Sequence, residues 1–317
     1  MKEGNFSLED NELNVIHNST RPLPIIYVWC IVVKVEDNNN ILLRNFRIFL
    51  KSLLFHSKHP LSLNILTEDK SKARVDFLVS VVTTKMGYKF YEIIFHNIED
   101  ASDKVRPITE TMQLYFSSVP GSYYSDSLFY ISLGLHNIAP SYHHKVILVD
   151  IDIKFETDII KLYEHFTEFH VDTLFGLAPE LSPVYHHMLW KWKQIHPNSS
   201  FGEPSYKGFS GLNSGVMLMN LDNIRKSEEF NNCITREYID NVTAKYAFKG
   251  HLGDQDFYTL LAVEKPHLIK ILSCTWNRQL CQWWKHHGYM DEFNEFARCD
   301  GTVNIYHGNC NTPIPVK

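Results

Sequence analysis

Two carboxylates follow a run of apolar residues near the middle of the chain. Val146 to Val149 has the composition of a buried central strand, and Asp150 and Asp152 come directly after it. Open α/β sheets bind ligands at the carboxyl ends of their strands. Residues i and i+2 of an extended chain point the same way, so both carboxylates can reach one hard cation such as Mg²⁺ or Mn²⁺. The pair predicts a metal site, and a solvated turn after a strand is the structural alternative.

A phosphatase of the haloacid-dehalogenase type also ends a strand in DxD, with the first Asp as nucleophile. In that family the motif lies near the N-terminus and a small hydroxyl residue follows it. This chain has Lys154 at that position and carries the motif near residue 150, which argues against a phosphatase.

Three further polar motifs follow in the second half of the chain. Gly211 to Gly215 has the composition of a turn, and its Asn213 offers both donors and an acceptor to a sugar hydroxyl. Gly253 to Asp256 groups two acids around Gln255; a capped helix start explains the acids better than the glutamine. His307 follows a short apolar strand, and imidazole suits Mn²⁺ alongside carboxylates. Each motif alone has a structural explanation, and their combination indicates a site.

Aromatic residues are frequent in the same half. Five of the six tryptophans lie there, and we expect most of them in the core. One or two in a cleft would stack on the apolar face of a pyranose. The five are Trp190, Trp192, Trp276, Trp283 and Trp284.

The elements that would position these residues alternate in the first half of the chain. Apolar patterns predict strands at 25–33, 61–66 and 90–95, and helices at 41–55 and 71–86. This alternation is typical of βαβ units with a parallel sheet, so the fold class is α/β. The second half is less regular, with helical patterns at 123–138, 185–193 and 227–243, a glycine-rich turn at 208–211 and a strand at 215–221. We expect it to complete a cleft at the carboxyl edge of the sheet.

Composition excludes several classes of protein. The chain has 317 residues, 44% hydrophobic and 21% charged, with a net charge of −5. This is the balance of a globular protein, and no basic block is long enough to bind nucleic acid. The longest apolar run, 23–33, is shorter than the roughly 20 residues that a membrane span needs. We expect a polar tail at 1–22, a single catalytic domain at 23–317 and no membrane span in this chain.

Cysteine placement and glycosylation sequons indicate an oxidising compartment. Four cysteines fall within the last 44 residues, where two disulfides with any of three connectivities are possible: Cys274, Cys281, Cys299 and Cys310. Reduced thiols are the alternative, and the absence of a CxxC pair argues against zinc. The sequons lie at Asn5, Asn18, Asn198 and Asn241.

The order of the motifs DxD, NSGV, GDQD and HG resembles that of the glycogenin-like retaining glycosyltransferases of family 8, which have a GT-A fold. The stretches YYSDSLF, SPVYHHMLWKW, GHLGDQDF, CTWNRQLC and IYHGNCNTPIP are similar to the α-1,3-xylosyltransferase branch of that family. The likeness runs from about residue 25 to the end. It implies a Rossmann-like mixed sheet flanked by helices, with a cysteine- and tryptophan-rich C-terminal part.

The resemblance implies roles for named residues. Mn²⁺, with Mg²⁺ as the second choice, would be held by Asp150, Asp152 and His307. A UDP-sugar donor would be bound by Val33, Lys34, Ile151, Asn213, Asp254, Gln255, Gly308 and Asn309, and Gln255 and Asp254 would be the catalytic pair, with Gln255 near the anomeric carbon. The acceptor would contact Trp190, His251, Leu252 and Trp284. The chain departs from the wider family at Pro313, where a lysine usually neutralises the diphosphate.

The function that the resemblance implies is the transfer of xylose from UDP-xylose, with retention, to the terminal α-xylose of xylosyl-glucose on EGF-like repeats, as on Notch-type proteins. The product would be Xyl-α1,3-Xyl, made in the lumen of the endoplasmic reticulum. The membrane anchor that the family leads one to expect is not found in this sequence. The alternatives are another retaining Mn²⁺-dependent UDP-hexosyltransferase, or a glycan-binding protein without catalysis.

Overall fold

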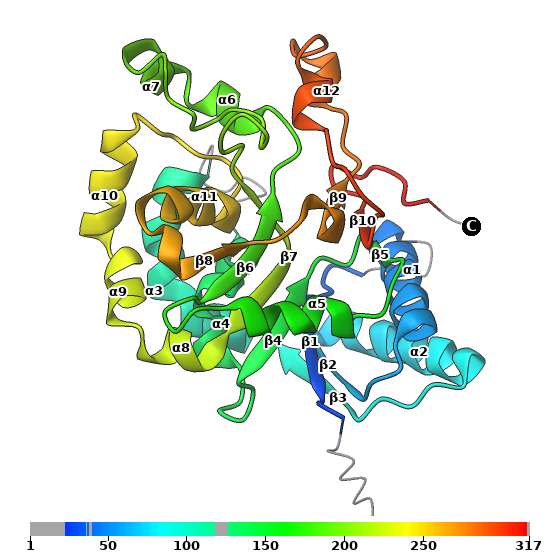
Figure 1. The fold of residues 1–317 in the computed structure, drawn as a ribbon. Helices are drawn as coiled ribbons and strands as arrows, with labels where there is room; N and C mark the ends of the chain where they lie inside the picture. The colour runs from blue at the N-terminus through cyan, green and yellow to red at the C-terminus, as the bar shows by residue number, and fades with distance from the viewer. Residues whose placement is uncertain (1–22, 36, 38–39, 118–125, 316–317) are drawn as a thin grey trace, which may run out of the picture.

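A mixed seven-stranded sheet forms the centre of the structure (Figure 1). The computed structural model describes residues 23–35, 37, 40–117 and 126–315, so the predicted tail at 1–22 lies outside the described residues. The strand order is β3-β2-β1-β4-β7-β6-β8. These strands are β1 (Ile26–Ile31), β2 (Leu61–Thr67), β3 (Glu92–Asn97), β4 (Lys145–Val149), β6 (Phe175–Pro179), β7 (Leu212–Asn220) and β8 (Ile269–Ile271).

The first four strands pair in parallel, as the alternation of strands and helices predicts. β7 runs antiparallel to both β4 and β6, which makes the sheet mixed. The carboxyl end of β4 therefore lies beside the start of β7. This edge is where the sequence placed its polar motifs.

Helices cover both faces of this sheet. They are α1 (Ile41–His56), α2 (Asp69–Met86), α3 (Ile98–Phe116), α4 (Ile131–Ile138), α5 (Ile160–Glu164), α6 (Val184–Met188), α7 (Trp190–Ile195), α8 (Leu221–Lys226), α9 (Glu228–Cys233), α10 (Arg236–Lys245), α11 (Asp254–Glu264) and α12 (Phe293–Phe296). Side chains alternate along a strand, so Val28 and Ile147 join the core under α1 and α2. Trp29 and Leu148 join the core under α3, α4 and α11.

Helix α3 is absent from the sequence prediction, which assigns no element to residues 96–122. Pro107 lies inside this helix and removes one backbone donor, which hides the helical pattern. The start of the helix is well defined, because the Asn97 side chain accepts hydrogen bonds from the amides of Glu99 and Asp100. Apolar residues at Ile98 and Val105 face the core.

Two predicted helices are each broken in two. The helix predicted at 185–193 is interrupted at Leu189, between α6 and α7. The one predicted at 227–243 is interrupted after Cys233, because the Thr235 side chain accepts from the amide of Tyr238 and so caps a new helix, α10. The strand predicted at 215–221 begins earlier, at Leu212.

A small second sheet brings the C-terminal part to the end of β4. Its order is β5-β10-β9, formed by β5 (Ile153–Phe155), β10 (Ile305–His307) and β9 (Arg278–Gln279). β10 pairs antiparallel with β5, with His307 opposite Ile153. Because β5 begins just after Asp152, this register places His307 next to the two carboxylates.

The two disulfides predicted for the C-terminal part are present. They join Cys274 to Cys299 and Cys281 to Cys310, one of the three connectivities that the sequence left open. Cys30 and Cys233 are buried free thiols. Within the described residues, none of the helices has the length and apolar character needed to cross a bilayer.

Candidate active site

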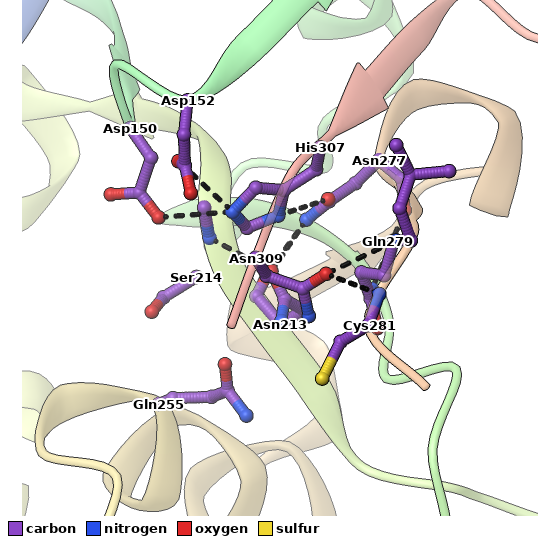
Figure 2. Close-up of polar contacts among 12 residues, drawn as sticks. Asp150, Asp152, Asn213, Ser214, Gln255, Asn277, Gln279, Cys281, His307 and Asn309 are labelled. Carbon is purple, nitrogen blue, oxygen red and sulfur yellow. Dashed lines mark hydrogen bonds and ion pairs between the residues drawn. The ribbon is translucent and has the colours of Figure 1, made fainter. Parts of the chain in front are cut away.

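Asp150, Asp152 and His307 come together at the carboxyl end of β4 (Figure 2). Each offers one ligand atom, and these atoms lie within 4.8 Å of one another. His307 Nε2 is 3.4 Å from Asp150 Oδ2 and 3.4 Å from Asp152 Oδ1. The predicted meeting of the two carboxylates is confirmed, but the predicted cause is wrong. The chain bends at Ile151 and Asp152 instead of continuing as an extended strand.

His307 is buried and is held from its other side by Asn277. The Asn277 Oδ1 atom lies 2.9 Å from His307 Nδ1. Burial would lower the pKa of His307, but Asp152 and Asp150 together raise it to about 10. The two carboxylates thus stabilise positive charge at Nε2, where a metal ion would take the place of the proton. No signal in the sequence singles out Asn277.

Asn213 lies inside strand β7, so the turn predicted from Gly211 to Gly215 is wrong in its second part. Asn213 Oδ1 accepts hydrogen bonds from the Gly215 amide at 3.1 Å and from Asn277 Nδ2 at 2.8 Å. Gly215 lies directly against His307. An ideal Cβ built there would overlap the imidazole of His307 and lie 3.0 Å from Asp150 Oδ2. This position therefore requires glycine.

The motif at the start of α11 contains three consecutive polar side chains that all make hydrogen bonds. The Asp254 carboxylate accepts from the hydroxyls of Ser132 and Ser214. Gln255 and Asp256 lie beside it in the first turn of the helix. Burial raises the pKa of Asp254 and that of Asp256 to about 7 in each case.

Asp256 fixes the loop before the helix and does not cap it in the ordinary way. Its Oδ2 accepts from the amides of His251 and Leu252, each at 2.7 Å. The residue before the helix is Gly253, which has φ +68° and contributes no side-chain cap. The capped helix start given as the structural explanation for the acids is therefore wrong: Asp256 anchors the loop before the helix, and Gln255 turns into the site.

The end of β1 lines a pocket of about 300 Å³ that includes Val33 and Lys34. Lys34 adopts a left-handed backbone conformation with φ +58°, which is uncommon for a residue with a side chain. Its amide donates to Glu68 Oε1 at 2.7 Å, and its Nζ lies 3.4 Å from Asp126 Oδ2. Glu68 follows β2, so the rule that selects Asp150 after β4 would also have found it.

The segment after His307 closes the site from the C-terminal side. The Gly308 amide donates to the Asp152 carbonyl at 2.7 Å. Asn309 Oδ1 accepts from the amides of Leu280 and Cys281 at 3.1 Å and 3.0 Å. These bonds anchor Asn309 to the segment after β9.

Three of the four predicted acceptor residues lie at the start of α11 or beside His187. His251 and Leu252 precede α11, and the ring of Trp284 lies 5.1 Å from that of His187. Charge on His187 adds to burial in lowering the pKa of His251, which reflects how near these histidines are. Trp190 is 52% exposed on α7, and its recorded ring contact is with Lys191.

Most tryptophans of the second half belong to the core or pack against it, as expected. Trp276 is buried, Trp192 and Trp284 are partly buried and pack against the core, and Trp190 and Trp283 are half exposed. Trp283 and Trp284 pack edge to face at 4.9 Å. Trp190 and Trp283 are therefore the two tryptophans of this half that lie mainly on the surface.

Comparison with known proteins identifies the family. No protein-family model matches the chain. Xyloside xylosyltransferase 1 of Mus musculus is 40% identical over 298 residues, covering 92% of this chain and 76% of the relative. The chain belongs to the xyloside xylosyltransferase 1 family. A crystal structure of the mouse protein in its apo form superposes with a TM-score of 0.84 at 39% identity, over 92% of this chain and all of that one.

A more distant structure shows the same fold. An active-site mutant of LgtC superposes with a TM-score of 0.53 at 15% identity, covering 89% of this chain and 86% of that one. Membership of the xyloside xylosyltransferase 1 family confirms the predicted GT-A fold and the predicted enzyme class, a glycosyltransferase.

Proposed function

We propose that this protein transfers xylose from UDP-xylose to the terminal α-xylose of a xylosyl-glucose disaccharide, with retention of configuration, to give Xyl-α1,3-Xyl. The observation that carries the proposal is the grouping of Asp150, Asp152 and His307 beside the first turn of α11, in a chain 40% identical to a xyloside xylosyltransferase. Residues from β4, β10 and α11 would then meet the diphosphate, the metal and the donor sugar at one edge of the sheet.

The ligand atoms fit a Mn²⁺ ion, with Mg²⁺ as the second choice. Two carboxylate oxygens and one imidazole nitrogen lie within 4.8 Å of one another, and such a mixture of ligands suits Mn²⁺. When bound, the ion supplies Lewis-acid stabilisation of the leaving diphosphate. Val33, Lys34 and the backbone at Ile151 would bind the uridine, while Gly308 and Asn309 would contact the phosphates.

The reaction would proceed on one face of the donor sugar. The bond from the anomeric carbon to the β-phosphate oxygen breaks, a bond to the acceptor O3 forms, and the acceptor proton passes to the β-phosphate oxygen of UDP. Gln255 would stabilise positive charge at the anomeric carbon with its side-chain oxygen. Asn213 and Asp254 would bind donor hydroxyls.

The acceptor would be an EGF-like repeat carrying xylosyl-glucose, as on Notch-type proteins. His251, Leu252 and Trp284 would contact the sugar, and Trp190 would contact a more distant part of the acceptor. The proposed compartment is the lumen of the endoplasmic reticulum. Two disulfides support it, because such bonds persist in oxidising compartments.

The test is a transfer assay with purified protein, Mn²⁺ and an α-xylosyl-glucose acceptor, with UDP-xylose and UDP-glucose offered in parallel. Product mass and linkage are determined by mass spectrometry and NMR. We expect a 1,3-linked α-xylose from UDP-xylose and no product after chelation of the metal. Replacing Gln255 by Ala should lower kcat by about 100-fold.

Transfer of glucose instead of xylose would refute UDP-xylose as the donor, and the protein would then be a retaining hexosyltransferase. Neither transfer nor hydrolysis of any UDP-sugar would refute catalysis and favour a glycan-binding protein. Wild-type turnover by the Gln255→Ala variant would refute the role of Gln255 alone.

A further inference from the structure

Glu180 is a buried carboxylate in the centre of the site that belongs to none of the sequence motifs. It follows directly after β6 and is 4% exposed. Its Oε2 accepts hydrogen bonds from Asn213 Nδ2 at 2.9 Å and from Gln255 Nε2 at 3.2 Å. The amide and the hydroxyl of Ser182 also hydrogen-bond to the carboxylate. One side chain thus accepts from two carboxamides that point in different directions.

The hydrogen bond from Gln255 to Glu180 decides which way the amide of Gln255 faces. Gln255 Nε2 donates to Glu180 and to the Tyr185 hydroxyl at 3.3 Å, and Tyr185 in turn donates to Asp256 Oδ1 at 3.0 Å. Both hydrogens of the Gln255 amino group are therefore engaged. Figure 2 shows the Gln255 oxygen turned toward the side on which Asp150 and His307 lie, with the nitrogen turned away.

The hydrogen bond from Asn213 to Glu180 starts a chain of hydrogen bonds that ends at His307. With Asn213 Nδ2 bound to Glu180, Asn213 Oδ1 must face Gly215 and Asn277, as the donating amide of Gly215 independently requires. Asn277 then presents Nδ2 to Asn213 and Oδ1 to His307. An oxygen at that position accepts a hydrogen from His307 Nδ1, which leaves the lone pair of Nε2 free for a metal.

We propose that Glu180 is a positioning residue for both halves of the site: it orients the oxygen of Gln255 toward the donor sugar and, through Asn213 and Asn277, selects the tautomer of His307 that binds metal. The Gln255 part rests on the proposed function, because it assumes a donor sugar at that oxygen. The His307 part rests only on the metal site.

A carboxylate suits this position because it only accepts hydrogen bonds. Asn213 and Gln255 both donate to Oε2, and Ser182 also donates to the carboxylate. In a glutamine of the same shape one of these accepting oxygens is replaced by an NH₂ group. Where that NH₂ takes the place of Oε2, it faces the NH₂ groups of the two carboxamides. Gln255 can relieve the conflict only by turning over, which points its own NH₂ at the donor sugar.

The experiment compares Glu180→Gln with wild type and with a matched control, Glu264→Gln. Glu264 lies at the other end of α11 and pairs with Lys245, away from the site. The dissociation constant of Mn²⁺ is measured by the EPR signal of the free ion, without any sugar nucleotide. Transfer from UDP-xylose then gives kcat and KM, and circular dichroism checks the fold.

For Glu180→Gln we expect kcat to fall about 100-fold with KM for UDP-xylose within about 3-fold. The dissociation constant of Mn²⁺ should rise about 10-fold. The control should change neither. In a Gln255→Ala background the same substitution should lower kcat by less than about 3-fold, because no amide remains to be oriented. In an Asn277→Ala background, Glu180→Gln should leave the dissociation constant of Mn²⁺ unchanged. If Glu180 acted only through its negative charge, the substitution would still weaken Mn²⁺ binding in that background.

Unchanged kcat and unchanged Mn²⁺ affinity in folded Glu180→Gln would overturn the proposal. So would an undiminished loss of kcat in the Gln255→Ala background together with an undiminished loss of Mn²⁺ affinity in the Asn277→Ala background. If Glu180→Gln does not fold, Glu180→Asp replaces it. That variant keeps an accepting group but withdraws it by one methylene, and it should show the same pattern with smaller losses. If wild type transfers no xylose, the proposed function fails, while the Mn²⁺ measurements still decide the role of Glu180 at His307.

Discussion

Replacing Gly215 by alanine should damage the metal site without unfolding the protein. The glycine lies in β7 against the imidazole of His307. An added Cβ would lie 2.7 Å from His307 Nδ1 and 3.0 Å from Asp150 Oδ2, and it would overlap the carbon between the two ring nitrogens. Ordinary contacts with a Cβ begin near 3.4 Å. His307 must therefore move by several tenths of an ångström or more.

The cost follows from how little the site can move. His307 is held on one side by Asn277 at 2.9 Å and is fixed in β10 by its pairing with Ile153. Forcing extra volume into such a packed site costs about 1–3 kcal/mol, and metal–ligand distances tolerate only about 0.2 Å. If that energy is lost from metal binding, the dissociation constant of Mn²⁺ rises roughly 5- to 150-fold.

Titration of Mn²⁺ followed by EPR measures this change, and Gly87→Ala is the control. Gly87 ends α2 at φ +60°, and a Cβ added there would meet only open space. Alanine at this position therefore has a strained backbone but does not contact the metal site. We expect Gly87→Ala to lose stability and keep its Mn²⁺ affinity, and Gly215→Ala to lose Mn²⁺ affinity and transfer together. A folded Gly215→Ala protein that binds Mn²⁺ like wild type would show that the close packing of the glycine against His307 has no role in metal binding.

Two further predictions concern stability. Burial raises the pKa of Asp256 to about 7, above its ordinary value of 3.8, so the folded protein holds the proton more tightly and its free energy of unfolding falls as the pH rises from about 4 to 7. In urea unfolding, the free energy of unfolding of Asp256→Asn should not show this pH dependence. Relative to wild type it should rise by roughly 1.4 kcal/mol per pH unit between about pH 4 and 7. If the free energies of the two proteins change in parallel with pH, the raised pKa of Asp256 is contradicted. Replacing both Cys281 and Cys310 by serine should lower the free energy of unfolding by about 3 kcal/mol and weaken Mn²⁺ binding, because this disulfide joins the segment after β9 to the segment after His307. The same change at Cys274 and Cys299 should lower stability and spare Mn²⁺ binding, and equal Mn²⁺ losses in the two variants would refute the distinction.

The sequence predicted the βαβ half of the fold because its strands are continuous apolar runs and its helices have clear caps. Asn40 caps α1 with its side chain, and Gly87 ends α2 in a left-handed conformation. The helix α3 was missed because Pro107 interrupts the pattern of an otherwise regular helix. Local signals such as caps decide where a helix begins or ends. Tertiary packing decides whether a helix continues through an unfavourable residue such as Pro107.

The three candidate metal ligands could be predicted because each lies at or just after the end of an apolar strand pattern. His307 was found by this rule, although its strand belongs to the small second sheet and not to the central one. Glu68 and Glu180 also follow strands, β2 and β6, and the same rule applied consistently would have selected them. Asn277 follows a single 3₁₀ turn, and its role depends on pairing between segments that no local pattern describes.

The carboxamide side chains show why the uncharged residues of such a site are harder to predict from sequence than the charged ones. Asn213, Asn277 and Gln255 have neither charge nor a fixed polarity of their own, since each can present an oxygen or an NH₂ in either direction. Their directions are set by groups that cannot turn over, the Gly215 amide and the Glu180 carboxylate. Glu180 therefore affects the chemistry of His307 and Gln255 without contacting metal or substrate, and a substitution that preserves its shape but not its polarity changes both.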